Sequence, residues 1–353
     1  MDAIFALGYG LLSPAIPGAT GEADEKNASR LCLTLAGLLS CSGIAWAQNL
    51  QALRVANQKS GIKLLLEAAG ELQEVPYAIQ FSEFPAAAPL GEALNAGAVD
   101  VGGLGDAPYV FALGSGAALK VVCIVHAAGR LSTAIIVPKD SPLHGVADLK
   151  GKRIVTGRGS IGHFLALKAL REAGLQSSDV RFVNLLPSDA RSVLESGGAD
   201  AWSTWDPYTA IAITQGARVL VNGSHLLSNN FYLAATAQAI EDKRPQLTDF
   251  VKRLERAYRW ANQHPDAYAA AQSRVTGLSR ETHLESARNT RFQRVPIDDA
   301  LIEGLQATAD LYFEEGITGK RIEVSQGFDR SFNEAADGPL LPAPSRVQAS
   351  GRP

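Results

Sequence analysis

The sequence predicts an α/β protein built from two domains, each with a mainly parallel sheet covered by helices, and a cleft between them. Short apolar runs alternate with segments of helical spacing along most of the chain, as at residues 153–155 and 164–174. This alternation is typical of parallel strands joined by helices that cover both faces of a sheet. The chain has 353 residues, 46% of them hydrophobic, which is enough apolar material for two cores.

The first domain is predicted to be discontinuous, at residues 48–137 and 232–334. Its strands are expected at residues 50–56, 77–83, 99–103, 119–125 and 133–137. Helical spacing follows at residues 62–69, at 90–94 and around 110–113. Residues 231–235 are predicted as the return crossing from the second domain, and from residue 241 onward the pattern is helical and amphipathic.

The second domain is predicted at residues 138–231, inserted into the first. Its strands are expected at residues 153–155, 180–186, 199–203 and 218–221, with helices at 164–174 and 189–196. Residues 335–353 are rich in Pro, Ala, Ser and Gly, a composition that predicts a disordered tail.

Residues 1–47 are predicted to be a leader that contains an export signal. Lys26 and Arg30 precede an apolar segment too short to span a bilayer, and the small-x-small triplet at 45–47 is typical of a cleavage site. An alternative places a lipoprotein box before Cys41, which would then be acylated and retained. Because this signal is predicted to be cleaved on export, we expect a periplasmic protein. No later run is long and apolar enough for a transmembrane helix.

Charge and cysteine content exclude several classes of function. The net charge is −3 and no block of Lys and Arg stands out, which argues against a nucleic-acid-binding protein. Cys32 and Cys41 lie in the leader, so Cys123 is left alone in an apolar run, where a buried core residue is expected. The six histidines are scattered without the spacing of metal ligands, and we expect neither a metal nor a cofactor.

The segment at residues 157–163 is the first candidate for a binding site. A Gly-rich turn here follows a buried strand and precedes a helix. The unpaired N–H groups at the start of that helix, its dipole and the hydroxyl of Ser160 together favour an anion. The alternative is an ordinary strand-to-helix turn in which Ser160 only caps its helix.

Comparable turns recur at residues 58–61 and 105–108. In open α/β sheets ligands bind beyond the carboxyl ends of the strands, so these turns are expected to converge on one cleft. The segment at 205–208 adds Asp206 as a predicted N-cap, Pro207 at the first helical position, and two aromatic rings. Asp106 and Asp206 have the simpler alternative of helix capping, and Trp205 and Tyr208 that of core or hinge packing.

Several segments together carry a resemblance to a known family. The stretches LRVANQKSGIKLLL, EFPAAAPLGEALNAGAVDVGGLGDAP, ADLKGKRIV with GRGSIGH, and ADAWSTWDPY occur in this order. They resemble the solute-binding proteins of ABC importers, in the branch for aliphatic sulfonates beside its nitrate and taurine relatives. The resemblance implies the type II periplasmic-binding-protein fold, with a hinge that closes over the ligand, and a membrane permease as partner.

The resemblance implies a sulfonate head group held by the three turns, with the segment at 205–208 completing the wall. The predicted ligand-binding residues are Gln58, Lys59, Ser60, Gly105, Asp106, Gly159, Ser160, Ile161, His163, Trp205, Asp206 and Tyr208. His163 has the alternative role of a packing residue, and Lys59 that of a solvated cation. One departure from the family pattern is the order Ser60-Gly61, where relatives carry Gly and then Ser.

Three classes of function remain to be compared. We favour a non-catalytic, monomeric receptor that captures an aliphatic sulfonate, with nitrate, taurine or an aromatic sulfonate as alternative ligands. An enzyme on the same scaffold would need a reactive cysteine or a His/Cys-rich cleft, and the sequence places neither near the turn at residue 58. The effector domain of a regulator would come with a basic helix-turn-helix segment, which is not evident.

Overall fold

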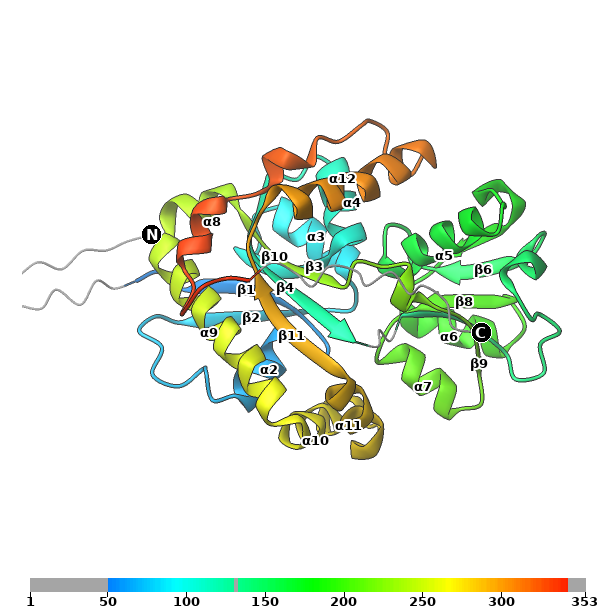
Figure 1. Ribbon diagram of the computed structural model, residues 1–353, viewed down its shortest axis with the longest axis horizontal. Coiled ribbons are helices and arrows are strands. Elements are labelled where there is room, and N and C mark those ends of the chain that lie inside the picture. The colour runs from blue at the N-terminus through cyan, green and yellow to red at the C-terminus, as the bar shows by residue number, and fades with distance from the viewer. Residues whose placement is uncertain (1–49, 130–132, 342–353) are drawn as a thin grey trace, which may run out of the picture. The chain divides into compact units, whose positions relative to one another are not determined.

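This computed structural model describes residues 50–129 and 133–341 (Figure 1). The leader, its cleavage site, Cys41 and the end of the predicted tail at 342–353 lie outside the described residues. Within the described ranges the chain forms a six-stranded and a five-stranded sheet, each covered by helices. Among these residues no helix has the length and apolarity needed to cross a bilayer.

The six-stranded sheet has the order β11-β4-β10-β3-β1-β2. Its strands are β1 (Leu53–Gln58), β2 (Ile79–Phe84), β3 (Val101–Gly105), β4 (Leu119–Gly129), β10 (Asn230–Thr236) and β11 (Thr290–Val295). The pairs β1–β2 and β1–β3 are parallel, whereas β10 is antiparallel to β3 and β4, and β11 is antiparallel to β4. The sheet is therefore mixed rather than mainly parallel. The sequence pattern missed β11 and predicted helix there.

Alternating side chains on β10 show why both faces of this sheet are covered. Leu233 and Ala235 point into a core shared with α2 (Ile62–Ala68) and α9 (Arg244–Gln263). Tyr232 and Ala234 point into the opposite core, shared with α3 (Ala87–Asn95), α4 (Asp106–Gly114) and α12 (Asp299–Glu314). The period of two along the strand thus supplies one set of apolar side chains to each helical layer.

The five-stranded sheet has the order β7-β6-β8-β5-β9. Its strands are β5 (Ala134–Val137), β6 (Arg153–Thr156), β7 (Arg181–Asn184), β8 (Ala201–Thr204) and β9 (Arg218–Asn222). The sequence assigned residues 133–137 to the first domain, whereas β5 pairs with β8 and β9 in the second sheet. The chain therefore enters this sheet before Ala134. It returns at Asn230, two residues before the predicted boundary.

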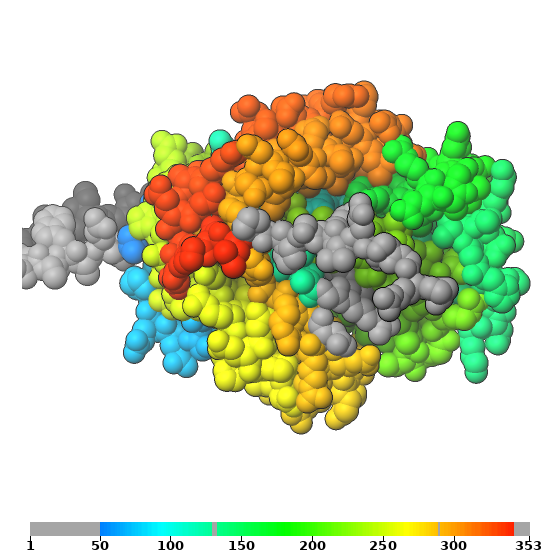
Figure 2. All heavy atoms as spheres, viewed as in Figure 1, coloured from blue at the N-terminus to red at the C-terminus, as the bar shows by residue number. Residues whose placement is uncertain are grey.

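Helices cover both faces of the five-stranded sheet as well. Phe164 and Leu165 of α5 (Ile161–Glu172) pack on one face. Trp202 on β8 packs on the other, against α6 (Pro187–Glu195) and α7 (Tyr208–Thr214). Figure 2 shows the orange surface of α12 meeting the green surface of α5, and the ion pair between Arg171 and Glu314 joins them at 2.7 Å.

The remaining α-helices precede β11 in the chain. They are α8 (Ala237–Asp242), α10 (Pro265–Thr276) and α11 (Arg280–Asn289), with short 3-10 turns η1 (Val146–Leu149), η2 (Ser177–Asp179), η3 (Gly223–His225), η4 (Val324–Gly327) and η5 (Arg330–Glu334). The predicted tail begins at residue 335, but Ala335 is buried and its carbonyl oxygen accepts a hydrogen bond of 2.7 Å from Arg294. The start of that segment is thus packed on the domain.

An ion pair between arginine and aspartate fixes the start of one parallel strand in each sheet. The backbone N–H and the guanidinium of Arg54, on β1, donate to the carboxylate of Asp100, which directly precedes β3. In the second sheet Arg153, on β6, donates in the same way to Asp200, which directly precedes β8. The two sheets therefore share one device that fixes the register of two parallel strands whose carboxyl ends lie at the same edge.

The two copies of this device differ in burial. Asp100 is 2% exposed, and it also accepts a hydrogen bond of 2.7 Å from the ammonium of Lys243. Burial alone would raise the pKa of Asp100, but the hydrogen bonds from Arg54 and Lys243 outweigh it and lower the pKa. The side chain of Asp200 is 32% exposed and no second cation of this kind reaches it among the described hydrogen bonds.

Asp100→Asn should lower the free energy of unfolding by about 3 kcal/mol, because the ammonium of Lys243 would stay buried without its carboxylate. Urea unfolding followed by circular dichroism measures this loss. Asp200→Asn is the matched control and should cost clearly less, since water reaches that pair. Equal losses in the two variants would contradict the assigned role of burial.

Candidate ligand-binding site

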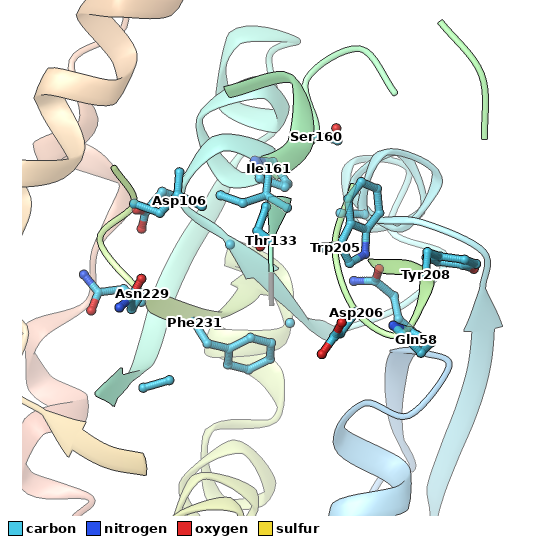
Figure 3. A pocket seen from close by; sticks show the side chains of 18 of the residues that line it. Gln58, Asp106, Thr133, Ser160, Ile161, Trp205, Asp206, Tyr208, Asn229 and Phe231 are labelled. Carbon is cyan, nitrogen blue, oxygen red and sulfur yellow. The ribbon is translucent and has the colours of Figure 1, made fainter. Parts of the chain in front are cut away.

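A cavity of about 360 Å³ lies between the two sheets and is lined by residues from both (Figure 3). Of the predicted site residues, the structure brings together around this cavity Gln58, Lys59, Gly105, Asp106, Ser160, Ile161, Trp205, Asp206 and Tyr208. Ser60, Gly159 and His163 are not part of its lining.

The cavity is bounded by the carboxyl ends of strands. Gln58 ends β1, Gly105 ends β3, and Trp205 directly follows β8. Ser160 lies in the turn that follows β6. Because parallel strands of both sheets end at this cavity, the turns that begin the following helices point their N–H groups toward one region.

Ser160 holds the start of α5 as well as lining the cavity. Its Oγ accepts a hydrogen bond of 3.1 Å from the backbone N–H of His163, and it lies 3.4 Å from the hydroxyl of Thr156. The capping role considered for Ser160 is therefore real. The N–H groups of Ile161 and Gly162, in the first turn, have no intrahelical acceptor by helix geometry, so this end of α5 can receive an anion.

Gly159 and His163 support this turn from behind. Gly159 has a φ of +72°, and a Cβ there would lie 2.4 Å from the ring of Phe111. Its N–H donates to Nδ1 of His163 at 3.2 Å, and the imidazole packs on Phe182. His163 is 3% exposed; burial, with a smaller contribution from Arg158, lowers its pKa to about 4. A neutral imidazole therefore accepts from the turn instead of facing the cavity.

Arg158 also turns away from the cavity. Its guanidinium donates a hydrogen bond of 3.1 Å to the carbonyl oxygen of Ile317, which follows α12. The hydroxyl of Tyr312, on α12, donates to the carbonyl oxygen of Ser160 at 3.3 Å. The α5 turn of the second sheet is thus held in place by side chains and backbone belonging to the first.

The segment at residues 205–208 differs from its prediction in where the helix begins. We predicted Asp206 as the N-cap, but α7 begins at Tyr208, with Pro207 in the N-cap position. Oδ1 of Asp206 accepts a hydrogen bond of 3.3 Å from the N–H of Ala210. The rings of Trp205 and Tyr208 lie edge to face, 6.3 Å apart, and form an aromatic wall beside Asp206 (Figure 3).

Asp106 is positioned by the segment that returns to the first sheet. Its carboxylate accepts hydrogen bonds from the hydroxyls of Ser228 and Tyr232. Asp106 is 3% exposed, in the first turn of α4, and Gly105 occupies the N-cap position. This carboxylate therefore ties α4 to the residues just before and within β10.

The turn after β1 is held by Asn57, whose side chain is buried. Oδ1 of Asn57 accepts a hydrogen bond of 3.0 Å from the N–H of Lys63, and its amide group donates to Glu83. Ser60 adopts a left-handed conformation with φ of +63°, which glycine takes at lower cost. The family's Gly-Ser order would place glycine at this position. Ser60 lines a neighbouring cavity instead.

The residues at the two crossings between the sheets were not predicted as cavity residues from the sequence. Thr133, just before β5, lines the cavity, and so do Leu227, Asn229, Asn230 and Phe231 around the start of β10. Figure 3 shows Asn229 and Phe231 on the side of the cavity opposite Trp205. The signal available was the polar pair at 229–230 directly before an apolar strand, at the point where the chain changes sheets.

Phe231 takes its place because β3 carries glycine next to it. A Cβ at Gly103 would lie 2.0 Å from the ring of Phe231. The ring therefore covers Gly103 and forms the floor of the cavity, with the alkyl side chain of Ile161 on another side (Figure 3). The cavity thus combines apolar walls with N–H groups at one end, the arrangement expected for a small ligand with a polar head and an apolar body.

The described residues that line this cavity include no cysteine or histidine. Cys123 lies on β4 in the core beneath α9, and burial raises the pKa of its thiol to about 11. Within the described ranges no three His, Cys, Asp or Glu side chains form a group that could hold a metal ion. The polar groups that line the cavity are suited to binding.

Two α/β lobes that each supply strand ends and helix starts to one shared cavity define a two-lobed solute-binding protein. The sequence profile of the family described as "NMT1/THI5 like" matches residues 83–268. A protein of Escherichia coli (strain K12) named for binding aliphatic sulfonates is 35% identical over 304 residues, covering 83% of this chain and 94% of its own. The chain therefore belongs to this family, in the branch of the aliphatic-sulfonate-binding proteins.

Two further relatives support the assignment to this branch. A protein of Bacillus subtilis (strain 168), also named for binding aliphatic sulfonates, is 30% identical over 292 residues, covering 82% of this chain and 86% of its own. The structure of the alkanesulfonate-binding protein SsuA from Xanthomonas axonopodis pv. citri bound to MOPS superposes with a TM-score of 0.71 at 32% identity. It covers 79% of this chain and 98% of its own, which confirms the predicted fold.

Stability should fall by about 3 kcal/mol between pH 7 and pH 4 through His163 alone. The pKa of His163 is lower in the folded protein than the ordinary value near 6.5, so below that value the unfolded chain binds the additional proton. Urea unfolding at a series of pH values should show a shallower decline for His163→Gln. His225→Gln, at an exposed position, should keep the decline of the wild type. A slope unchanged in His163→Gln would contradict this.

Proposed function

We propose that this protein is an exported, monomeric receptor that captures an aliphatic sulfonate in the cavity between its lobes and delivers it to an ABC importer in the membrane. Membership in the aliphatic-sulfonate-binding branch supports the ligand class. The observation that carries the proposal is that the ends of strands from both sheets line one cavity with apolar walls.

The first turn of α5 is the proposed seat of the sulfonate. It offers the N–H groups of Ile161 and Gly162 together with the side-chain hydroxyl of Ser160. A sulfonate keeps its negative charge at any physiological pH, and N–H groups at a helix start bind such an anion without a full positive charge. Lys59, at the edge of the cavity, adds a cation.

The apolar walls are the proposed contacts for the alkyl chain. Ile161, Trp205 and Phe231 come from both lobes and face the cavity (Figure 3). Burial of each methylene group contributes about 0.8 kcal/mol, so an alkanesulfonate gains affinity that nitrate or sulfate cannot gain. A ligand that touches both lobes stabilises the form in which they are close together, which a membrane permease can recognise.

A catalytic role has less support. An enzyme that cleaves a carbon–sulfur bond would need a nucleophile or a general base beside the ligand. The thiol of Cys123 is buried on β4 with a raised pKa, and His163 is 3% exposed behind the α5 turn. We therefore propose binding and release without chemical change.

Short alkanesulfonates should raise the melting temperature of the mature chain. A ligand that binds only the folded protein adds about 2.7 kcal/mol when present at a hundredfold excess over its Kd. Differential scanning fluorimetry with ethanesulfonate, butanesulfonate, an aromatic sulfonate, taurine, nitrate and sulfate measures the shift. A larger shift with nitrate or taurine than with any alkanesulfonate would reassign the ligand, and no shift with any of them would reject the proposal.

Ser160→Ala should weaken alkanesulfonate binding by about 1–3 kcal/mol, the cost of a lost hydrogen bond to a charged group. It should also cost about 1 kcal/mol of stability, because the cap of α5 is lost. Isothermal titration calorimetry measures the affinity, urea unfolding measures the stability, and Ser279→Ala is the control for the loss of a helix cap. Ser279 caps α11 in the same way but does not line the cavity, so that variant should lose stability and keep its affinity.

A further inference from the structure

We propose that a second chamber beside the ligand cavity binds an uncharged, hydrogen-bonding tail of an organosulfonate. This inference rests on the proposed function. The chamber has a volume of about 220 Å³. Lys59, Ala127, Asp206 and Pro207 line both cavities, so the two spaces adjoin along a shared wall.

The far side of the chamber is formed by the helical hairpin of α10 and α11. Tyr268, Gln272 and Thr276 recur every fourth residue on α10 and so share one face of that helix. His283 and Ser286 face them from α11 at a spacing of three. The side chains of both helices at these spacings thus line one partly open chamber.

The chemistry of the lining favours a neutral polar group. Gln272 brings an amide and Ser286 a hydroxyl. The hydroxyl of Thr276 is already hydrogen-bonded to His283, and that of Thr290 to the carbonyl oxygen of Ser286. Among the described residues of the lining, Lys59 and Asp206 carry the full charges, which are of opposite sign. His283 is 8% exposed, and burial lowers its pKa, so its ring is neutral near pH 7. An ether or hydroxyl tail meets donors and acceptors here. A purely alkyl tail would cover the amide of Gln272 and the hydroxyl of Ser286 without a hydrogen bond to either.

Ser60 lines the chamber directly after Lys59, which lines both cavities. Its Oγ is buried and has no protein hydrogen-bond partner within the described part of the chain. The residue also adopts the left-handed conformation, which orients this side chain into the lining of the chamber. Strained residues with unsatisfied polar atoms concentrate where ligands bind, because the ligand completes their hydrogen bonds.

The test compares three ligands by isothermal titration calorimetry: ethanesulfonate, ethanesulfonate extended by ethylene-glycol units, and an alkanesulfonate of the same length as the extended one. The wild type should bind the glycol-extended ligand about tenfold more tightly than the alkyl ligand of equal length, the value of one or two hydrogen bonds. Equal affinities for the two long ligands would overturn the inference.

Ser286→Phe fills the chamber and should abolish this preference while affinity for ethanesulfonate stays within about twofold. Ala267→Phe is the matched control, because Ala267 is exposed on the same hairpin and does not line the chamber. Gln272→Leu removes the amide while keeping a similar side-chain volume. If Ser286→Phe does not fold, the loss of the ligand preference is measured in Gln272→Leu instead. A preference retained in Gln272→Leu and in folded Ser286→Phe would overturn the chamber's role.

The outcome with ethanesulfonate separates this inference from the proposed function. Binding of ethanesulfonate without any preference among long ligands rejects the chamber and leaves the receptor intact. Failure of all sulfonates to bind rejects the proposed function, and the chamber's assignment with it.

Discussion

The pairing of β1 with β3 and of β6 with β8 is the constraint on which the cavity depends. Each pairing is registered by an arginine on the first strand and an aspartate just before the second: Arg54 with Asp100, and Arg153 with Asp200. With both strands of a pair fixed, their carboxyl ends stop at the same edge. The helices that follow then begin there, and their N–H groups face the space between the sheets.

Local patterns predicted the elements, whereas long-range pairing did not follow from them. The α5 turn was predictable because strand, glycine turn and helix are adjacent in sequence. β11 was missed because its polar residues suit an amphipathic helix. Arg294 is buried through partners distant in sequence, namely the carboxylate of Glu255 and carbonyl oxygens of the C-terminal segment. β5 was assigned to the wrong sheet because strand alternation does not specify which sheet a strand joins.

The difference between local patterns and long-range pairing also separates the cavity residues that were predicted from those that were missed. Turn residues such as Gln58 and Ser160 follow strands, so the sequence indicates them. His163 was included by proximity, but two residues along a helix turn the side chain by about 200° from Ile161, which directs it into the core. Asn229 and Phe231 reach the cavity only because the chain changes sheets there, a fact of tertiary structure.

Carboxylates repel an anion bound beside them, so their presence at this cavity needs a structural reason. Their hydrogen bonds to the neighbouring segments provide one. Asp106 accepts from the hydroxyls of Ser228 and Tyr232, and Asp206 accepts from the N–H of Ala210. Each carboxylate thereby orients its own lobe's part of the wall, and its negative field disfavours small anions that lack other contacts. An anion with an apolar body offsets that repulsion by burying its chain against Trp205 and Phe231. On the proposed function, selectivity for organic over inorganic anions would follow from the same residues that hold the wall in place.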